Sequence, residues 1–237
     1  MCYKYIKLCC HTEVAERGIV MSWKYILFDL DGTVTDSHEG IINCIKYALG
    51  EMGYNIPCDE ELNRYIGPPL YKGFQDIAGM EYEEALKAAA IYRSKYSITG
   101  IFENKPYDGI EEVLKTLKEH GKVVMLATSK PEEYAIRILE HFNLSMYFDG
   151  ITGGSIDGRH NDKDIIIEES ILRLGLSSSD KPDIIMVGDR KYDIIGAKAC
   201  GIASAGVYYG FARKGELETA GADYIINTVS EITGLLL

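Results

Sequence analysis

Apolar positions along the chain follow two alternating patterns, one with the length of a strand and one with the spacing of a helix. Residues 25–28 form a short apolar run, which predicts a buried strand. From Asp36 onward, apolar residues recur at i, i+4, i+7 and i+8, which predicts one face of a helix. Gly53 is expected to end this helix.

The next part of the chain is predicted to contain only helices. Residues 59–66 form a short helical segment that the Gly-Pro-Pro sequence at 67–69 stops. Residues 81–98 are rich in alanine and other strong helix formers, which predicts a long helix. We therefore expect residues 37 to about 104 to be helical, with no strand.

After Pro106 the pattern changes to strands that alternate with helices of about ten residues. We predict strands over 122–127, 147–151, 183–187, 203–207 and 223–226. We predict helices over 108–120, 131–142, 163–174, 192–200, 216–220 and 229–236. In this reading Asp108 is an N-cap, and Pro131 stands in the first turn of its helix.

Such alternation predicts an α/β fold, a Rossmann-like doubly wound parallel sheet with helices on both faces. The all-helical block 37–104 interrupts it and is expected to form an inserted cap domain. The core domain then comprises 21–36 and 105–237. Ligands of such sheets bind at the carboxyl ends of the strands, so this insertion is placed like a lid over the expected site.

The first twenty residues do not fit either pattern. Residues 1–20 mix charged residues with tyrosines and cysteines, without the apolar stretch of a signal peptide. Met21 then opens a fresh start directly before the first predicted strand. We interpret 1–20 as an N-terminal extension that is loosely held or lies upstream of the true start.

Composition excludes several classes of function. The chain has 237 residues, with 46% hydrophobic and 26% charged residues, which suits a globular protein with a full core. Its net charge of −11 argues against a nucleic-acid polymer as partner. No apolar run approaches the roughly 18–20 residues of a membrane span. The six cysteines are scattered, which favours a reduced, cytoplasmic location. Composition leaves a monomer and a homodimer open.

Candidate catalytic residues follow several predicted strands, at the point where each strand ends. Asp29 and Asp31 follow the first strand, and Thr128 and Ser129 follow the strand at 122–127. Further along, Lys163 begins a helix, and two more acidic residues follow the strand at 183–187. These two residues are Asp189 and Asp193. Because parallel strands end at one edge of a sheet, we expect all these side chains to meet there.

These residue types suit phosphoryl transfer. A phosphomonoester dianion repels an anionic nucleophile, so its charge must first be cancelled. Mg²⁺ prefers oxygen ligands, and the carboxylates of Asp29 and Asp189 can supply two of them, with the backbone carbonyl of Asp31 as a third. Asp193 is a further ligand or a residue that holds its loop by hydrogen bonds.

The other groups would hold and process the phosphoryl group. The Thr128 hydroxyl can donate a hydrogen bond to it, and Lys163 can supply a point charge. Backbone N–H groups around Gly32 and Ser129 can complete the cradle. Asp29 would then attack phosphorus to give an aspartyl-phosphate, while a protonated side chain two residues later, that of Asp31, serves as general acid and then base.

Other cations could reach the same phosphate. Arg159 or Lys181 could replace Lys163 as the phosphate-binding cation. We interpret Lys130, Arg190 and Lys191 as ordinary loop charges, although each could also touch substrate.

The order of these motifs resembles the haloacid dehalogenase superfamily of phosphatases. Residues 29–33 read Asp-Leu-Asp-Gly-Thr and match its first motif, which adds Thr33 to the predicted phosphate-binding residues. Thr128 and Lys163 match its second and third motifs. Gly-Asp at 188–189, with the later Asp193, matches the fourth. The resemblance covers the chain from about residue 23 to its C-terminus.

A helical insertion directly after the first motif resembles the members with an α-helical cap. Within these, residues 66–70, 127–131 and 188–197 are similar to the phosphoglycolate phosphatase and 5′-nucleotidase-like branch. The resemblance implies a Mg²⁺-dependent phosphatase of a small phosphorylated metabolite.

Two alternatives stay open at this point. A phosphomutase of β-phosphoglucomutase type would return the phosphoryl group to a sugar phosphate. A phosphate-binding signalling module also uses aspartates, a hydroxyl and a lysine, but it lacks a second aspartate like Asp31 and lacks a lid.

Overall fold

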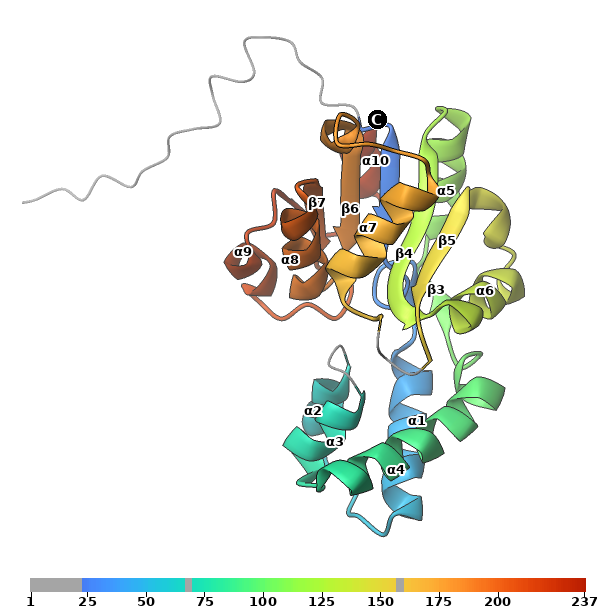
Figure 1. The fold of residues 1–237 in the computed structure, drawn as a ribbon. Coiled ribbons are helices and arrows are strands. Elements are labelled where there is room, and N and C mark those ends of the chain that lie inside the picture. Colours follow the sequence, from blue (N-terminus) through green and yellow to red (C-terminus); the bar gives the residue numbers. More distant parts are fainter. Residues whose placement is uncertain (1–22, 67–69, 157–159) are drawn as a thin grey trace, which may run out of the picture.

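A parallel β-sheet forms the centre of the molecule. The computed structural model describes residues 23–66, 70–156 and 160–237 (Figure 1). In this part of the chain a six-stranded sheet has the order β5-β4-β1-β6-β7-β8, and every pairing is parallel. Its strands are β1 (Tyr25–Phe28), β4 (Val123–Pro131), β5 (Gly150–Gly154), β6 (Ile184–Gly188), β7 (Ala203–Val207) and β8 (Tyr224–Ile226). The predicted Rossmann-like α/β fold is confirmed.

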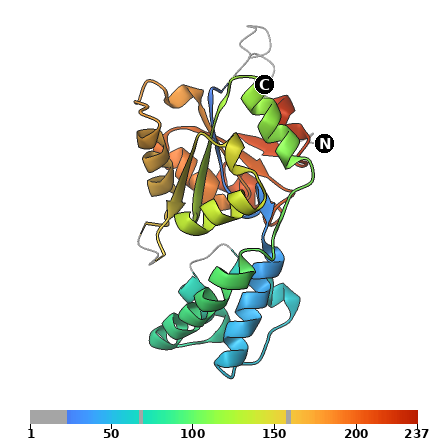
Figure 2. The same ribbon diagram turned by 90° about the vertical axis from the view of Figure 1, so that its right-hand side faces the viewer.

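Helices cover both faces of this sheet (Figures 1 and 2). Successive side chains of a strand point to opposite faces, so Ile26 and Phe28 of β1 pack into one core cluster and Leu27 into another. The first cluster includes residues of α5 (Ile110–Glu119), α6 (Glu132–His141) and α10 (Glu231–Leu236). The second includes residues of α7 (Lys163–Arg173) and α8 (Lys191–Cys200). A strand buried on both faces reads as a continuous apolar run, as β1 does.

The inserted helices form a separate group beyond the carboxyl ends of the strands (Figures 1 and 2). They are α1 (His38–Glu51), α2 (Asp59–Leu62), α3 (Leu70–Ala78) and α4 (Tyr82–Lys95), with a 3₁₀-helix (Asn63–Tyr65) and a π-helix (Tyr96–Gly100). Apolar side chains of α1 to α4 make a hydrophobic cluster, while Cys44 of α1 and Tyr96 of the π-helix pack into the first cluster of the sheet. Two short strands, β2 (Thr35–Asp36) and β3 (Lys105–Pro106), pair antiparallel where the chain enters and leaves this group. We call the group the helical cap.

Two elements differ from the sequence-based expectation. Helix α3 was not predicted, because it follows directly on the Gly-Pro-Pro sequence. The strand predicted at 147–151 exists, but its bounds are wrong, since residues Ser145–Tyr147 form a 3₁₀-helix and the strand is β5, Gly150–Gly154. The β5 sequence, Gly-Ile-Thr-Gly-Gly, has little strand propensity of its own, and its pairing with β4 decides its conformation.

The end of one predicted strand and the starts of two predicted helices, at 131 and 108, are also wrong. Strand β4 continues past Ala127 to Pro131, so Thr128 and Ser129 lie inside the strand and not after it. Pro131 is extended, with ψ of 128°, and α6 begins after it. The predicted N-cap Asp108 gives way to Gly109, whose φ of 85° is the left-handed conformation that glycine tolerates best.

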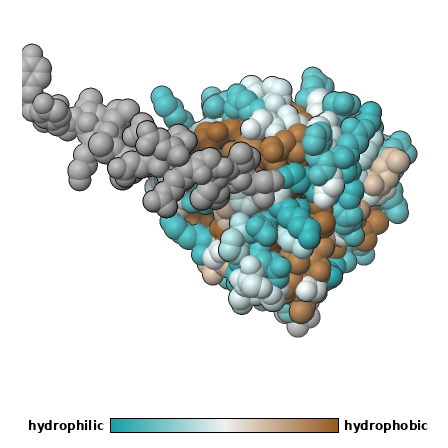
Figure 3. All heavy atoms as spheres, turned by 90° about the horizontal axis from the view of Figure 1, so that it is seen from above, coloured by the Kyte–Doolittle hydropathy of each residue, from teal (hydrophilic) through white to brown (hydrophobic). Residues whose placement is uncertain are grey.

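The surface carries both polar and apolar residues, as a sequence with 46% hydrophobic and 26% charged residues leads one to expect. Seen from the end far from the helical cap, hydrophilic and hydrophobic residues are interspersed (Figure 3). No helix in the described part of the chain has both the length and the apolar character needed to cross a bilayer. The described cysteines, Cys44, Cys58 and Cys200, are free thiols. The extension at 1–20, the Gly-Pro-Pro turn and Arg159 lie outside the described residues.

Truncation of a leucine in the central strand should be far more costly than truncation of one on the surface. Leu27 is fully buried in β1, so Leu27→Ala should lower the free energy of unfolding by about 2–5 kcal/mol. Leu172 is 70% exposed, and Leu172→Ala should change it by less than about 0.5 kcal/mol. Urea denaturation of both variants checks this, and equal losses would contradict the assignment of β1 to the core.

Candidate active site

The topology brings the predicted residues to one edge of the sheet. Strand β1 lies between β4 and β6, so Asp29, directly after β1, has Thr128 of β4 on one side and Asp189, directly after β6, on the other. The N–H of Asp29 still donates to the carbonyl of Val187 in β6, at 2.9 Å. Lys163 reaches this edge as the first residue of α7.

Three carboxylates meet in a buried cluster. One oxygen each from Asp29, Asp189 and Asp193 lies within 4.8 Å of the others. The Lys163 ammonium is 2.8 Å from Oδ1 of Asp29 and 2.8 Å from Oδ1 of Asp193. It also donates to the carbonyl of Ala127, at 3.1 Å. Burial lowers the pKa of Lys163, but the charges of Asp193 and Asp29 outweigh this and hold it above its usual value.

One lysine does not neutralise this cluster. Burial, and then the charges of Asp193 and Asp29, raise the pKa of Asp189 well above its usual value. Burial also raises the pKa of Asp193 to about 6, although Lys163 opposes the shift. Oδ1 of Asp189 is buried and has no hydrogen-bond partner among the described residues. An unpaired oxygen beside two more carboxylates fits a hard divalent cation, whose charge would favour the ionised forms.

Glycines make the close approach of these carboxylates possible. Gly188 ends β6, and a Cβ there would lie 2.2 Å from Cγ of Asp193. Gly32 has a φ of 81°, and a Cβ there would lie 2.1 Å from Oδ2 of Asp189. Both positions therefore exclude any side chain. The N–H of Gly32 donates to the carbonyl of Thr35 at 2.7 Å, so it is already engaged within the turn.

Asp31 stands apart from the three carboxylates. Its two oxygens accept hydrogen bonds from Nζ of Lys130, at 2.9 and 2.7 Å. The same ammonium lies 4.8 Å from the ring centroid of Tyr96, a residue of the π-helix that leads out of the helical cap. Lys130 is thus no ordinary loop charge, because it joins the predicted acid/base group to the cap.

The predicted hydroxyl groups occupy different environments. Thr128 is almost fully buried, and its hydroxyl oxygen accepts from the N–H of Lys130 at 3.2 Å, which leaves its own proton to donate. Ser129 is half-buried at the end of β4. The hydroxyl of Thr33 is buried without a partner among the described residues, while the Thr33 carbonyl accepts from Tyr209 at 2.9 Å. The phosphate-binding roles of these residues remain predictions.

Sequence reasoning missed a loop that follows β7. The N–H of Phe211 donates to Oδ2 of Asp189 at 2.7 Å and so orients that carboxylate. A Cβ on the preceding Gly210 would lie 2.0 Å from the carbonyl of Gly32, so this loop lies directly against the first motif. The Tyr-Gly-Phe sequence at 209–211 offered only a weak signal, a glycine after a strand.

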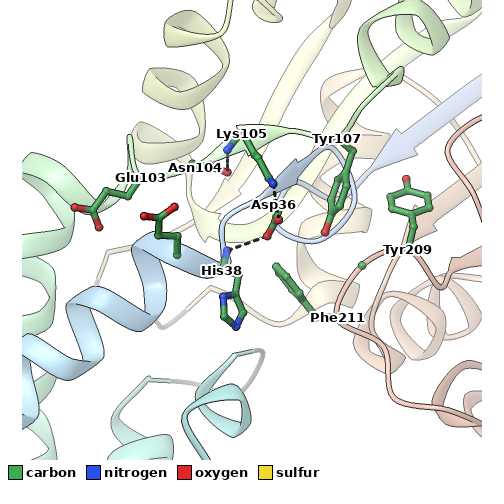
Figure 4. A pocket seen from close by; sticks show the side chains of 10 residues that line it. Asp36, His38, Glu103, Asn104, Lys105, Tyr107, Tyr209 and Phe211 are labelled. Carbon is green, nitrogen blue, oxygen red and sulfur yellow. Dashed lines mark hydrogen bonds and ion pairs between the residues drawn. The ribbon is translucent and has the colours of Figure 1, made fainter. Parts of the chain in front are cut away.

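A cavity of about 490 Å³ lies where the two segments that join the helical cap to the core meet the loop after β7 (Figure 4). Its lining comes from the two linkers and from the loop after β7. The linker residues are Asp36, His38, Glu39, Glu103, Asn104, Lys105 and Tyr107, and the loop residues are Tyr209, Gly210 and Phe211. The three clustered carboxylates do not line it. Phe211 thus lines this cavity, while its backbone N–H donates a hydrogen bond to Asp189.

Comparison with known proteins decides the family. The family model described as haloacid dehalogenase-like hydrolase matches residues 26–207. The chain belongs to the haloacid dehalogenase-like hydrolase family. The matched residues include the four predicted motifs, from Asp29 to Asp193.

Relatives of this haloacid dehalogenase-like hydrolase include phosphatases. It is 37% identical over 201 residues to a 5′-nucleotidase of Pseudomonas aeruginosa, and the aligned region covers 85% of this chain and 90% of that protein. It is 35% identical over 209 residues to tyrosine-protein kinase PtkA of Mycobacterium tuberculosis, which covers 87% of this chain and 67% of that protein. The crystal structure of a "predicted phosphatase" from Clostridium acetobutylicum is 44% identical and superimposes with a TM-score of 0.83, over 90% of this chain and 97% of that one.

These matches confirm the predictions of an enzyme and of a phosphatase of this superfamily. The acidic cluster of the haloacid dehalogenase-like hydrolase could hold a metal ion.

Filling the space at Gly188 should disrupt the acidic cluster. In Gly188→Ala the new methyl group displaces Asp193, so we expect Mg²⁺ affinity to fall by about 10–100-fold. Isothermal titration calorimetry measures this directly. Gly50→Ala is the matched control, since a Cβ at this helical position has open space, and its affinity should match the wild type. Equal affinities of all three proteins would contradict the cation site.

Stability without metal should depend on pH through Asp193. Its pKa is about 6 in the fold and about 3.9 in an unfolded chain, so the folded state holds the proton more tightly. This contribution to stability is full below about pH 4 and is lost as the pH rises through about 6. Mg²⁺ needs the ionised form and should raise the melting temperature more at about pH 7.5 than at about pH 5. Differential scanning fluorimetry with EDTA or Mg²⁺ measures both; equal gains at the two pH values would refute this account.

Proposed function

We propose that this enzyme is a Mg²⁺-dependent phosphatase that hydrolyses a small phosphomonoester through an aspartyl-phosphate at Asp29. The observation that carries the proposal is the buried cluster of Asp29, Asp189 and Asp193 around Lys163. A purely structural ion pair would need one carboxylate for one lysine. Three carboxylates at the carboxyl edge of a parallel sheet are typical of a cation site used in catalysis.

In the first step, a carboxylate oxygen of Asp29 attacks phosphorus in line with the leaving oxygen. The bond from phosphorus to the leaving oxygen breaks, and Asp31 gives its proton to that oxygen. Thr128 and Lys163 hold the phosphoryl oxygens during the transfer. Bound Mg²⁺ supplies the positive charge that allows an anionic carboxylate to approach a phosphate dianion.

In the second step, water attacks the phosphorus atom of the aspartyl-phosphate. Asp31, now ionised, takes a proton from this water, and the bond from phosphorus to the Asp29 oxygen breaks. Phosphate leaves and both carboxyl groups return to their starting states. Lys130 donates to both oxygens of Asp31 and so positions its ionised form, the form that takes the proton from water in this step.

The proposed substrate is a nucleoside 5′-monophosphate or phosphoglycolate. The relative at 37% identity is named a 5′-nucleotidase, which supports the nucleotide. The net charge of −11 supports a small substrate that is attracted locally, because the overall field of the protein repels phosphate esters. We further propose that the enzyme acts in the cytoplasm as a monomer or homodimer.

Transfer to an acceptor other than water is the second candidate reaction. The relative named tyrosine-protein kinase PtkA supports it, and a phosphomutase reaction would be another example. Both would share the first motif with a hydrolase and differ in the group that accepts the phosphoryl group. Release of inorganic phosphate without an added acceptor distinguishes hydrolysis from both.

Removing the nucleophile should abolish turnover. In Asp29→Asn the amide cannot attack phosphorus, so we expect kcat for p-nitrophenyl phosphate with Mg²⁺ to fall at least about 10³-fold. Asp59→Asn is the matched control, since the Asp59 side chain is 86% exposed in the cap, and its kcat should be unchanged. Retained activity of Asp29→Asn would rule out the aspartyl-phosphate at this residue.

The substrate class is best tested with a panel of phosphorylated metabolites. We expect a nucleoside 5′-monophosphate or phosphoglycolate to give the highest kcat/KM, measured by released phosphate. EDTA should stop the release and Mg²⁺ should restore it. A preference for a sugar bisphosphate that yields an isomeric sugar phosphate, without net phosphate release, would favour the mutase.

A further inference from the structure

Arg190 makes a direct contact between the metal-binding loop and the helical cap. It directly follows Asp189 and precedes α8. Its Nη1 donates to the backbone carbonyl of Ile66 at 2.6 Å, and Ile66 belongs to the cap. These two residues lie 124 positions apart in the chain. The exposed neighbour Lys191 makes no such contact among the described residues, so charge alone does not explain it.

The core holds the Arg190 side chain in place. Its Nε donates to Oε1 of Glu216 at 2.9 Å, and only 14% of its side chain is exposed. Glu216, at the start of α9 (Glu216–Ala220), also accepts from the N–H groups of Lys191 and Arg213. Burial raises the pKa of Glu216, but these N–H groups and Arg190 outweigh it and lower the pKa, so the ion pair is retained at neutral pH.

The backbone of Arg190 is tied to the metal site. Its N–H donates to Oδ2 of Asp193 at 3.0 Å, and the N–H of Asp193 donates back to the Arg190 carbonyl at 3.1 Å. Oδ1 of the same carboxylate contacts Lys163. A single residue therefore connects the clustered carboxylates with the cap.

The cap side of the contact is equally well anchored. Ile66 is buried in the hydrophobic cluster of the cap, and its N–H donates to the carbonyl of Asn63. The preceding Tyr65 is buried against Phe74 of α3, with ring centroids 5.4 Å apart. The Ile66 carbonyl therefore belongs to a residue that is packed into the cap.

We propose that Arg190 is a positioning residue that latches the cap closed over the metal site. This inference rests on the proposed phosphatase function. The guanidinium fork suits the role, because one face pairs with Glu216 while the other N–H groups remain free for the Ile66 carbonyl. The closed cap is the state that binds substrate, so the latch raises the fraction of enzyme ready to bind.

Loss of the latch should weaken substrate binding more than it slows chemistry. When the binding-competent state is a smaller fraction of the population, the apparent affinity falls by that fraction, and saturating substrate restores closure. For Arg190→Ala we expect KM for p-nitrophenyl phosphate to rise roughly tenfold and kcat to change by less than about threefold. The Mg²⁺ concentration for half-maximal activity should stay unchanged.

Hydrogen–deuterium exchange tests the latch without an activity assay, because it measures how firmly the cap is held. Backbone amides of residues 59–66 should exchange faster in Arg190→Ala, since the cap end is no longer held to the core. Lys191→Ala, which removes an equal charge from the next residue, should match the wild type in exchange and kinetics. Arg190→Lys should give an intermediate KM, because an ammonium lacks the planar fork. If the alanine variant does not fold, the lysine variant tests the latch in its place.

Two results would overturn the latch. The first is an unchanged KM together with unchanged hydrogen exchange in both Arg190 variants. The second is a loss of Mg²⁺ affinity with no change in exchange, because this would indicate a merely local role of Arg190. If the wild-type chain does not hydrolyse p-nitrophenyl phosphate, the proposed function fails, while the exchange comparison still decides the latch.

Discussion

Mutual repulsion of three buried carboxylates is the constraint around which this molecule is arranged. Asp29, Asp189 and Asp193 lie within 4.8 Å of one another, with a single ammonium between two of them. Burial makes ionised carboxylates costly, and each of them makes the others costlier. A fold keeps such a cluster only where a cation or a reaction uses it. Here the match to the haloacid dehalogenase-like hydrolase family agrees with such a use.

The surrounding fold can be understood as the frame that holds this cluster. The parallel order β4-β1-β6 sets the ends of three strands side by side, and β1 provides the central position. Glycines at 32 and 188 remove the side chains that would otherwise separate the carboxylates. The N–H of Phe211 then fixes Asp189 from a loop that comes late in the chain.

Among the contacts between this frame and the helical cap, two involve residues next to the predicted catalytic groups. Lys130 binds Asp31 on the core side and lies against Tyr96 at the exit from the cap. Arg190, directly after Asp189, extends to the carbonyl of Ile66. Asp31 and the loop of the clustered carboxylates are therefore each linked to the cap, the first through a cation–π contact of Lys130 and the second through a hydrogen bond of Arg190.

The sequence by itself determined the α/β class, the helical insertion and the residues of the acidic cluster, because apolar periodicity and short motifs are local properties. It failed at β5, at the start of α6 and at Asp108, where strand pairing and a left-handed glycine overrode local preference. Only the tertiary structure decided the partners of Lys130 and Arg190. These side chains bind groups 99 and 124 positions away, and no local pattern specifies which distant carboxylate or carbonyl a charged loop residue will meet.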